Sequence, residues 1–427
     1  MEFKLKKHSL KRMMQLMLIM IPFFLPGGLT VITGTEAVSY LFHGMKLFVI
    51  TFFVFNTKVA FKNNGNKELL GWIILYGLAI STTNLMHGQG VLAFRHVLFF
   101  PMFFVICVHY VKKDSLLFFE ALAVLTGVYN LIQIVTVVLF YPNGVNHFTG
   151  IFWEQTLAGA QYFFGGKNQA IYYMLLFLLS VTIKERLKGS DIPKRIYLYS
   201  GIFAVELLFL DSANSIANLM IFMLFYTLLT LKVEAKFSFL FNPYLYLGLG
   251  VFIFVSFCVL SMAGTMFFSN VVFKLLGRNS TFTNRIYIWQ AAIDAFKTSP
   301  LIGAGEIRLQ LVGDTAEQAH NMYLDIAYKY GLFGVVPYIA LLVFSCMKLD
   351  KERRSIFGAL CTSLYFIMII HNCFDAMDNY IFILLICLFS NIQLFYSIHR
   401  RKIRVRQMSR RYNQVVIKRV AQGNMVT

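Results

Sequence analysis

Charged residues are scarce in this sequence, and their scarcity excludes several classes of protein. Only 14% of the 427 residues are Asp, Glu, Lys or Arg, whereas about a quarter of a soluble globular domain is charged. Acidic side chains are the scarcest, with 20 against 39 basic ones. The composition therefore excludes an ordinary soluble enzyme, and a hydrophobic content of 58% excludes a disordered chain.

Cysteine is also sparse, and its placement argues against disulfides and metal binding. None of the six cysteines belongs to a CxxC pair, and nearly all lie inside apolar runs. In such surroundings cysteine acts as a small hydrophobic residue. We therefore expect neither a secreted disulfide scaffold nor a metal site.

Long apolar runs take the place of the missing charge. A helix needs about 20 predominantly apolar residues to cross a bilayer, and twelve segments meet this requirement. The sequence predicts an all-α polytopic membrane protein with about 12 transmembrane helices, formed by a single domain over residues 1–427. The predicted spans lie near residues 13–34, 38–56, 69–88, 92–111, 116–140, 168–183, 196–212, 214–231, 243–263, 331–347, 355–371 and 380–398.

The distribution of lysine and arginine predicts the orientation of these spans. With the N-terminus inside, 30 of the 39 basic residues fall in the predicted inner segments, in agreement with the positive-inside rule. We expect both termini in the cytoplasm, with a basic tail over residues 399–427 attracted to anionic membrane lipids. Because the basic clusters alternate with apolar runs, membrane topology explains them better than a nucleic-acid partner does.

The predicted outer segment 264–330 is too long for a simple connection. Within it, residues 283–300 predict an amphipathic helix, because Ile286, Trp289 and Ile293 recur at helical spacing. Trp289 suits a membrane interface. The helix is therefore expected on the outer membrane surface or against the bundle.

A second helix is predicted over residues 315–331, followed by the tenth span. Thr315 begins a capping-box pattern, and Gly331 can end a helix. His320 would then lie early in this helix. A single histidine on a mixed helix face is more often structural than catalytic, so His320 alone leaves both interpretations open.

Six basic residues lie in the outer segment, against the trend of the rest of the chain. An anionic ligand such as a phosphate is the simplest explanation for them. They are Lys274, Arg278, Arg285, Lys297, Arg308 and Lys329.

Four short motifs follow one another in this part of the chain. They are Arg285 with Trp289, residues 300–305 (PLIGAG), residues 319–321 (AHN) followed by Tyr323, and residues 331–334 (GLFG). In this order they resemble the bacterial O-antigen ligase and polymerase superfamily. That family includes the Wzy-type polymerases of capsule, exopolysaccharide and O-antigen synthesis.

The resemblance implies a glycosyltransferase without metal or cofactor, acting on the outer face of the bacterial cytoplasmic membrane. A glycan would pass from undecaprenyl diphosphate to an acceptor sugar hydroxyl, which in Wzy-type polymerases belongs to another lipid-linked repeat unit. On the matching motifs, His320 would be the general base and Arg285 would hold the diphosphate. Trp289, Asn321 and Tyr323 would lie beside the substrate. A base and a guanidinium suit this chemistry, because the hydroxyl is a poor nucleophile and the leaving diphosphate develops charge.

The sequence departs from the family pattern at one point. Many members carry a Ser-Arg pair where residues 211–215 (DSANS) have no arginine. A second phosphate-binding arginine would have to come from elsewhere, and the candidates are Arg95, Arg278 and Arg308.

Two other functions stay open beside a polymerase. A ligase of the same fold would transfer a finished glycan to a different acceptor. A lipid-linked sugar transporter would predict polar groups at the membrane midplane, broken helices and internal symmetry, whereas the patterned polar residues here gather in one outer segment. A polymerase would have flippase and chain-length regulator proteins as partners.

Overall fold

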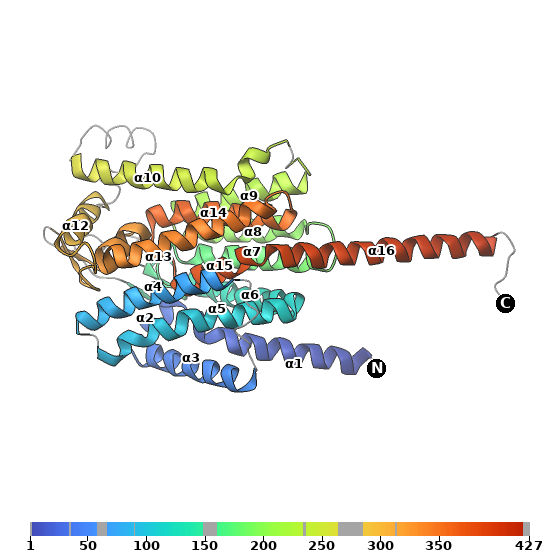
Figure 1. The fold of residues 1–427 in the computed structure, drawn as a ribbon, viewed down its shortest axis with the longest axis horizontal. Coiled ribbons are helices and arrows are strands. Elements are labelled where there is room, and N and C mark those ends of the chain that lie inside the picture. Colours follow the sequence, from blue (N-terminus) through green and yellow to red (C-terminus); the bar gives the residue numbers. More distant parts are fainter. Residues whose placement is uncertain are drawn as a thin grey trace.

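Helices make up most of the described chain in the computed structural model, and most of them run side by side along one axis (Figure 1). The structure describes residues 2–33, 36–57, 66–88, 90–147, 160–233, 236–263, 285–311 and 314–421.

The helices of the first half are α1 (Glu2–Met20), α2 (Gly27–Thr33), α3 (Ala37–Asn56), α4 (Lys67–Met86), α5 (Arg95–Lys113), α6 (Ser115–Phe140) and α7 (Ala170–Leu187). Those of the second half are α8 (Arg195–Phe209), α9 (Ala213–Thr230), α10 (Pro243–Ala263), α12 (Arg285–Thr298), α13 (Met322–Glu352), α14 (Ile356–Phe374), α15 (Asn379–Ser390) and α16 (Ile392–Ala421). Short 3-10 helices cover η1 (Ile21–Phe23), η3 (Gly90–Phe94) and η4 (Ser238–Phe241). Two small antiparallel hairpins complete the described secondary structure, β1 (Asn146–His147) with β2 (Ala160–Gln161) and β3 (Leu309–Leu311) with β4 (Asp314–Ala316).

Seven helices of the described residues are long and apolar enough to cross a membrane. An eighth span results if α15 and the first part of α16, which meet at a bend of 52°, count as one. The prediction of an all-α multi-pass membrane protein is confirmed, whereas the count of twelve spans stays a prediction. The seven helices are α3, α4, α5, α6, α9, α13 and α14.

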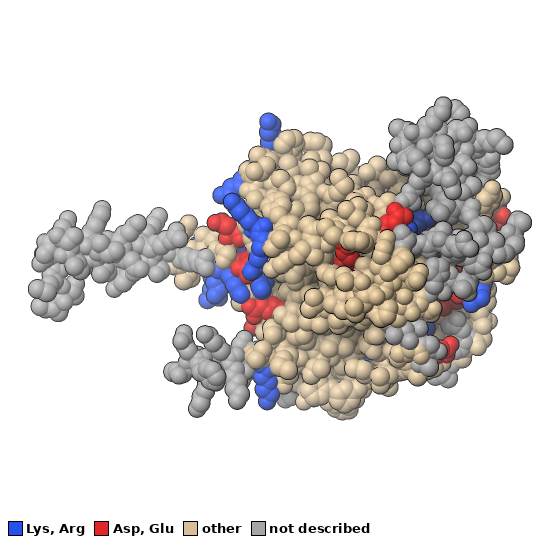
Figure 2. Space-filling view, turned by 180° about the vertical axis from the view of Figure 1, so that it is seen from behind, with Lys and Arg blue, Asp and Glu red and all other residues tan. Residues whose placement is uncertain are grey.

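The surface between the two ends of the molecule is largely apolar. Large side chains there are open to the surroundings, with Phe48 of α3 71% exposed and Leu131 of α6 61% exposed. Lysine, arginine and the acidic residues gather mainly towards the two ends (Figure 2). Such an extended apolar surface is incompatible with water and indicates contact with lipid.

The core is formed by helices that other helices enclose. α14 packs against α9, α10 and α13, and α15 packs against α5 and α13. The six cysteines are free, and all except the half-buried Cys258 are buried.

The chain direction defines the two ends of the molecule. α1 begins and α16 leaves at one end, and α12 lies at the other (Figure 1). Because α14 runs towards α12 and α15 runs back, residues 375–378 between them lie at the α12 end.

Candidate active site

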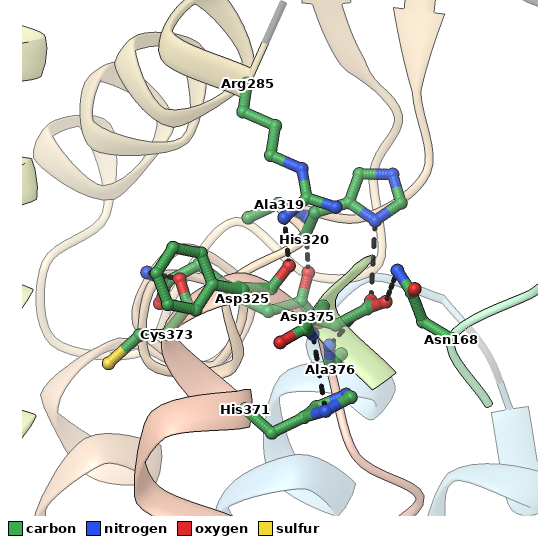
Figure 3. Close-up of polar contacts among 12 residues, drawn as sticks. Asn168, Arg285, Ala319, His320, Asp325, His371, Cys373, Asp375 and Ala376 are labelled. Carbon is green, nitrogen blue, oxygen red and sulfur yellow. Dashed lines mark hydrogen bonds and ion pairs between the residues drawn. The ribbon is translucent and has the colours of Figure 1, made fainter. Parts of the chain in front are cut away.

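Four segments that are distant in the sequence meet at the α12 end of the molecule (Figure 3). They are the first turn of α12 with Arg285, the turn before α13 with His320, the end of α14 with Asp375, and the turn before α7 with Asn168. The site therefore depends on the packing of four elements and not on one motif.

His320 has a left-handed backbone conformation directly before α13. Its φ is 47°, a value that few non-glycine residues adopt and that histidine adopts more often than most. Residues held in sparsely populated conformations are concentrated at functional sites, because the surrounding structure has to enforce them. The conformation supports a functional role for His320 without defining it.

The prediction of a helix over residues 315–331 is wrong for its first part. Thr315 lies in β4, and α13 begins only at Met322. Side chains bind both backbone groups of Ala319. The indole Nε1 of Trp289 donates to its carbonyl at 3.0 Å, and the Asp325 carboxylate accepts from its N–H at 2.9 Å. These bonds replace the ones that a helix would make there.

Trp289 consequently does not lie at a membrane interface. Its side chain is only 2% exposed and packs with Ile288 and Ala292 of the same helix. The prediction that residues 283–300 contain an amphipathic helix is confirmed by α12, although Thr283 lies outside the described residues. Of the two placements that the sequence allowed, α12 takes the one against the bundle, where it contacts α10 and α13.

Asn321 caps α13 and connects it to α14. Its side-chain oxygen accepts from the backbone N–H groups of Tyr323 and Leu324, both at 3.1 Å, and its amide nitrogen donates to the carbonyl of Cys373 at 3.0 Å. The Tyr323 hydroxyl donates to the carbonyl of Ile369 at 3.2 Å. Both predicted substrate-binding residues therefore hold the start of α13 against α14.

Asp375 is the carboxylate that faces His320. Its Oδ1 lies 3.5 Å from the imidazole Nδ1 and accepts from the backbone N–H of Ala376 at 2.9 Å, while Oδ2 accepts from Asn168 Nδ2 at 2.7 Å. Burial on its own raises the pKa of this carboxyl group. The hydrogen bond and charge of His320, together with the charge of Arg285, nevertheless hold the pKa of Asp375 well below its usual range.

Arg285 extends from the first turn of α12 towards His320 and Asp375 (Figure 3). Its guanidinium donates to the carbonyl of Phe374, the residue directly before Asp375. The positive charge therefore lies beside the carboxylate–imidazole pair.

The hydrogen-bonded network continues into the turn between α8 and α9. Ser212 Oγ lies 2.7 Å from both Asn168 Oδ1 and Ser215 Oγ. Lys167 Nζ donates to the carbonyl of Asp211 at 3.0 Å and lies 3.7 Å from its carboxylate. The segment 211–215 thus reaches the site without an arginine but next to a lysine.

The turn that follows α12 forms hydrogen bonds with the backbone of α13 at a break in that helix. Gly331 has φ 61° and interrupts the helix, so the carbonyls of Tyr328 and Lys329 are free to accept from elsewhere. The backbone N–H groups of Ala304 and Gly305 donate to them at 2.7 and 3.0 Å. This pairing fixes α12 and the β3–β4 hairpin against α13.

The two described candidates for the second arginine, Arg95 and Arg308, have contacts that lie outside the site. Arg95 begins α5 and donates to His96 at 3.1 Å. Arg308 is exposed and pairs with Glu317 at 2.9 Å. Within the described ranges, neither arginine contacts Arg285, His320 or Asp375. The third candidate, Arg278, lies in the segment 264–284, which the structure does not describe.

Asp375, Asn168 and Ser212 were missed by the sequence predictions as site residues. The signal for Asp375 is present, because residues 375–378 (DAMD) place two acids between two apolar runs in a chain with few acids. Asn168 and Ser212 carry no comparable signal. Their role depends on contacts across the bundle.

The described arrangement combines an imidazole, a carboxylate that faces it and a guanidinium. A carboxylate on Nδ1 orients an imidazole so that Nε2 can accept a proton, and a guanidinium binds phosphate oxygens. Within the described ranges no three His, Cys, Asp or Glu residues come together as a metal site would require. The site is thus suited to proton abstraction beside a bound anion.

The fold and this site define a multi-pass membrane protein with a carboxylate–imidazole pair at one end of its bundle. A sequence model described as O-Antigen ligase matches residues 198–339, which include Arg285 and His320 but not Asp375. A curated relative, the Exopolysaccharide production protein ExoQ of Rhizobium meliloti (strain 1021), is 29% identical over 89 residues. That alignment covers 17% of this chain and spans only 20% of the length of the relative. The resemblance to the O-antigen ligase and polymerase superfamily that the motifs predicted is confirmed.

Proposed function

We propose that this protein polymerises undecaprenyl-diphosphate-linked oligosaccharide repeat units on the outer face of the cytoplasmic membrane. The observation that carries the proposal is the meeting of Arg285, His320 and Asp375, which come from three separate elements. The similarity to O-antigen ligases and to an exopolysaccharide production protein supports a role in polysaccharide synthesis.

In the proposed reaction, the acceptor sugar hydroxyl attacks the anomeric carbon of the donor glycan. Its proton passes to Nε2 of His320, while Asp375 stabilises the imidazolium through Nδ1. The bond between the anomeric carbon and the diphosphate oxygen breaks, and undecaprenyl diphosphate leaves with the electron pair. Arg285 stabilises the negative charge on that leaving group.

Lys167 is the cation that we assign to the second phosphate position. It stands beside Asp211 and next in sequence to Asn168, which binds Asp375. Lysine offers a compact ammonium charge where arginine would offer a planar guanidinium. In this proposal Lys167 takes the place of the arginine that residues 211–215 lack.

The topology is part of the same proposal. Twelve spans would place both termini in the cytoplasm and residues 264–330 outside, where lipid-linked glycans are assembled. The α12 end and the end with both termini lie at opposite ends of the helices, as this topology requires.

A ligase is the second candidate function, because the same three side chains would serve it. The two differ in the acceptor: a polymerase uses another lipid-linked unit, and a ligase uses a different molecule. Flippase and chain-length regulator proteins are the partners that we propose for the polymerase.

The test is to measure polymer and lipid-linked intermediates in cells that carry H320A or H320Q at normal abundance. We expect long polymer to disappear and single repeat units to accumulate on the carrier lipid. H320Q keeps most of the side-chain volume. If H320Q loses activity but melts at the same temperature as the wild type, the loss comes from the missing base and not from misfolding. Unchanged polymer length in both variants would overturn the role of His320, and accumulation of finished polymer on the carrier would favour the ligase.

A further inference from the structure

A polar cavity lies at the end of the molecule opposite the candidate active site. Its volume is about 410 Å³, within the range of roughly 300–1,000 Å³ found for small-molecule sites. The last turn of α5, the last turns of α13, the residue before α4 and the bend between α15 and α16 line it. Because α13 and α15 both begin near the active site, their far ends place this cavity at the other face of the bundle.

The rim of the cavity is basic. Lys112, Lys348 and Lys351 line it together with a single acid, Glu352. In the part of the chain that the structure describes, none of these three lysines forms an ion pair. The neighbouring acid Asp350 pairs with Arg353 at 3.2 Å, so it does not neutralise them.

The floor is built from buried amide side chains. Asn66 and Asn391 line the cavity and are each only 5% exposed. Asn66 donates to Ser390 Oγ at 3.1 Å, and Asn391 donates to the carbonyl of Cys387 at 2.7 Å. These bonds fix the 52° bend between α15 and α16, so the cavity is a formed feature of the bundle.

We propose that this cavity binds the phosphate group of an anionic ligand. Converging ammonium groups bind phosphate as point charges, and the Asn66 amide has a second N–H besides the one that binds Ser390. The ligand would be the headgroup of an anionic lipid or a small soluble phosphate ester, since basic pockets between membrane helices hold such headgroups. The site is separate from the proposed reaction and does not rest on it.

The test uses the full-length protein purified in a neutral detergent. Thermal melting is followed while short-chain phosphatidylglycerol or glycerol phosphate is added in separate titrations. The variant K348Q/K351Q removes two rim charges, and K113Q/K232Q removes two exposed charges at the same end that do not line the cavity. Lys113 ends the same helix as Lys112, which makes the second variant a matched control.

We expect at least one probe to raise the melting temperature of the wild type and of K113Q/K232Q to the same degree. In K348Q/K351Q the half-saturating concentration should rise about tenfold. A response to phosphatidylglycerol alone identifies a lipid headgroup, and an equal response to glycerol phosphate identifies a soluble ester.

Three outcomes would overturn the proposal. They are no response of the wild type to either probe, a wild-type response in K348Q/K351Q, and an equal loss in the control variant. If K348Q/K351Q does not fold, K112Q tests the same rim from a different helix, and an unchanged half-saturating concentration there would count against the site.

Discussion

The shape of the Arg285 side chain is as important to the proposed chemistry as its charge. Its guanidinium donates to the carbonyl of Phe374, and a guanidinium presents five N–H groups in a planar fork that matches phosphate oxygens. We therefore expect R285K to lower glycan transfer about 100-fold, because a lysine cannot make both sets of bonds. Transfer is measured in membranes supplied with lipid-linked repeat units.

The matched control is K297R on the same helix. Lys297 is exposed and pairs with Asp294 at 2.8 Å, so exchanging one cation for another there should leave transfer unchanged. Wild-type transfer by R285K would contradict the assignment of Arg285 to the diphosphate.

The lowered pKa of Asp375 makes a prediction about stability. A carboxyl group whose pKa is lower in the folded than in the unfolded state adds stability above the unfolded pKa and loses it as the pH falls towards the folded pKa. The thermal melting of D375N should therefore lie below that of the wild type at about pH 5, and the gap should narrow below about pH 4. Melting curves of the detergent-solubilised protein across this range provide the measurement.

The exposed acid Asp191 supplies the control for this pH series. Its carboxylate is fully open to solvent and lies 3.9 Å from the guanidinium of Arg186. An ion pair this exposed adds little stability, so the melting temperature of D191N should stay close to that of the wild type at every pH. If the gap in melting temperature between the wild type and D375N widened as the pH fell, the ionised Asp375 would not stabilise the folded protein and the prediction would be wrong.

The residues of the site differ in how far the sequence could predict them. Arg285 and His320 could be predicted, because each belongs to a short motif that its neighbours in the sequence complete. Asp375 and Asn168 meet across 207 residues, and this contact follows from how α7 and α14 pack. Periodicity within one helix contains no information about such a pair.

At the scale of single elements, Gly331 is the position most sensitive to a small change. Its φ of 61° disfavours any side chain, and an added Cβ would collide with the carbonyl of Leu301. G331A should therefore cost about 3 kcal/mol or more, as backbone strain and overpacking combine. The measurement is the apparent melting temperature together with the amount of protein recovered from membranes.

Gly201 in α8 provides the control for G331A. An added Cβ at Gly201 would meet no atom within 4 Å, so G201A should be neutral or stabilising by up to about 1 kcal/mol. Equal losses in the two variants would show that the conformation at Gly331 is not the cause.

The elements also show where periodicity fails. The apolar spacing correctly predicted α12, because one face of that helix is buried against its neighbours. It failed before α13, where the indole of Trp289 and the carboxylate of Asp325 occupy the backbone groups of Ala319. Long-range side chains there override the local preference for a helix.

At the scale of the whole molecule, composition predicted more than local pattern did. The scarcity of charge and the length of the apolar runs were sufficient for an all-α membrane protein, which the structure has. The separation of charged residues into two ends is visible on its surface (Figure 2). Which end faces the cytoplasm follows from the positive-inside rule alone.

That orientation leads to a labelling prediction for the whole molecule. Lys297 on α12 and Lys402 on α16 are both exposed and belong to elements at opposite ends. With a membrane-impermeant maleimide, K297C should react in intact spheroplasts, whereas K402C should react only after the membrane is permeabilised. The wild type gives the background, since five of its six cysteines are buried. The opposite pattern would place Arg285 and His320 in the cytoplasm, where the proposed outer-face polymerisation could not occur.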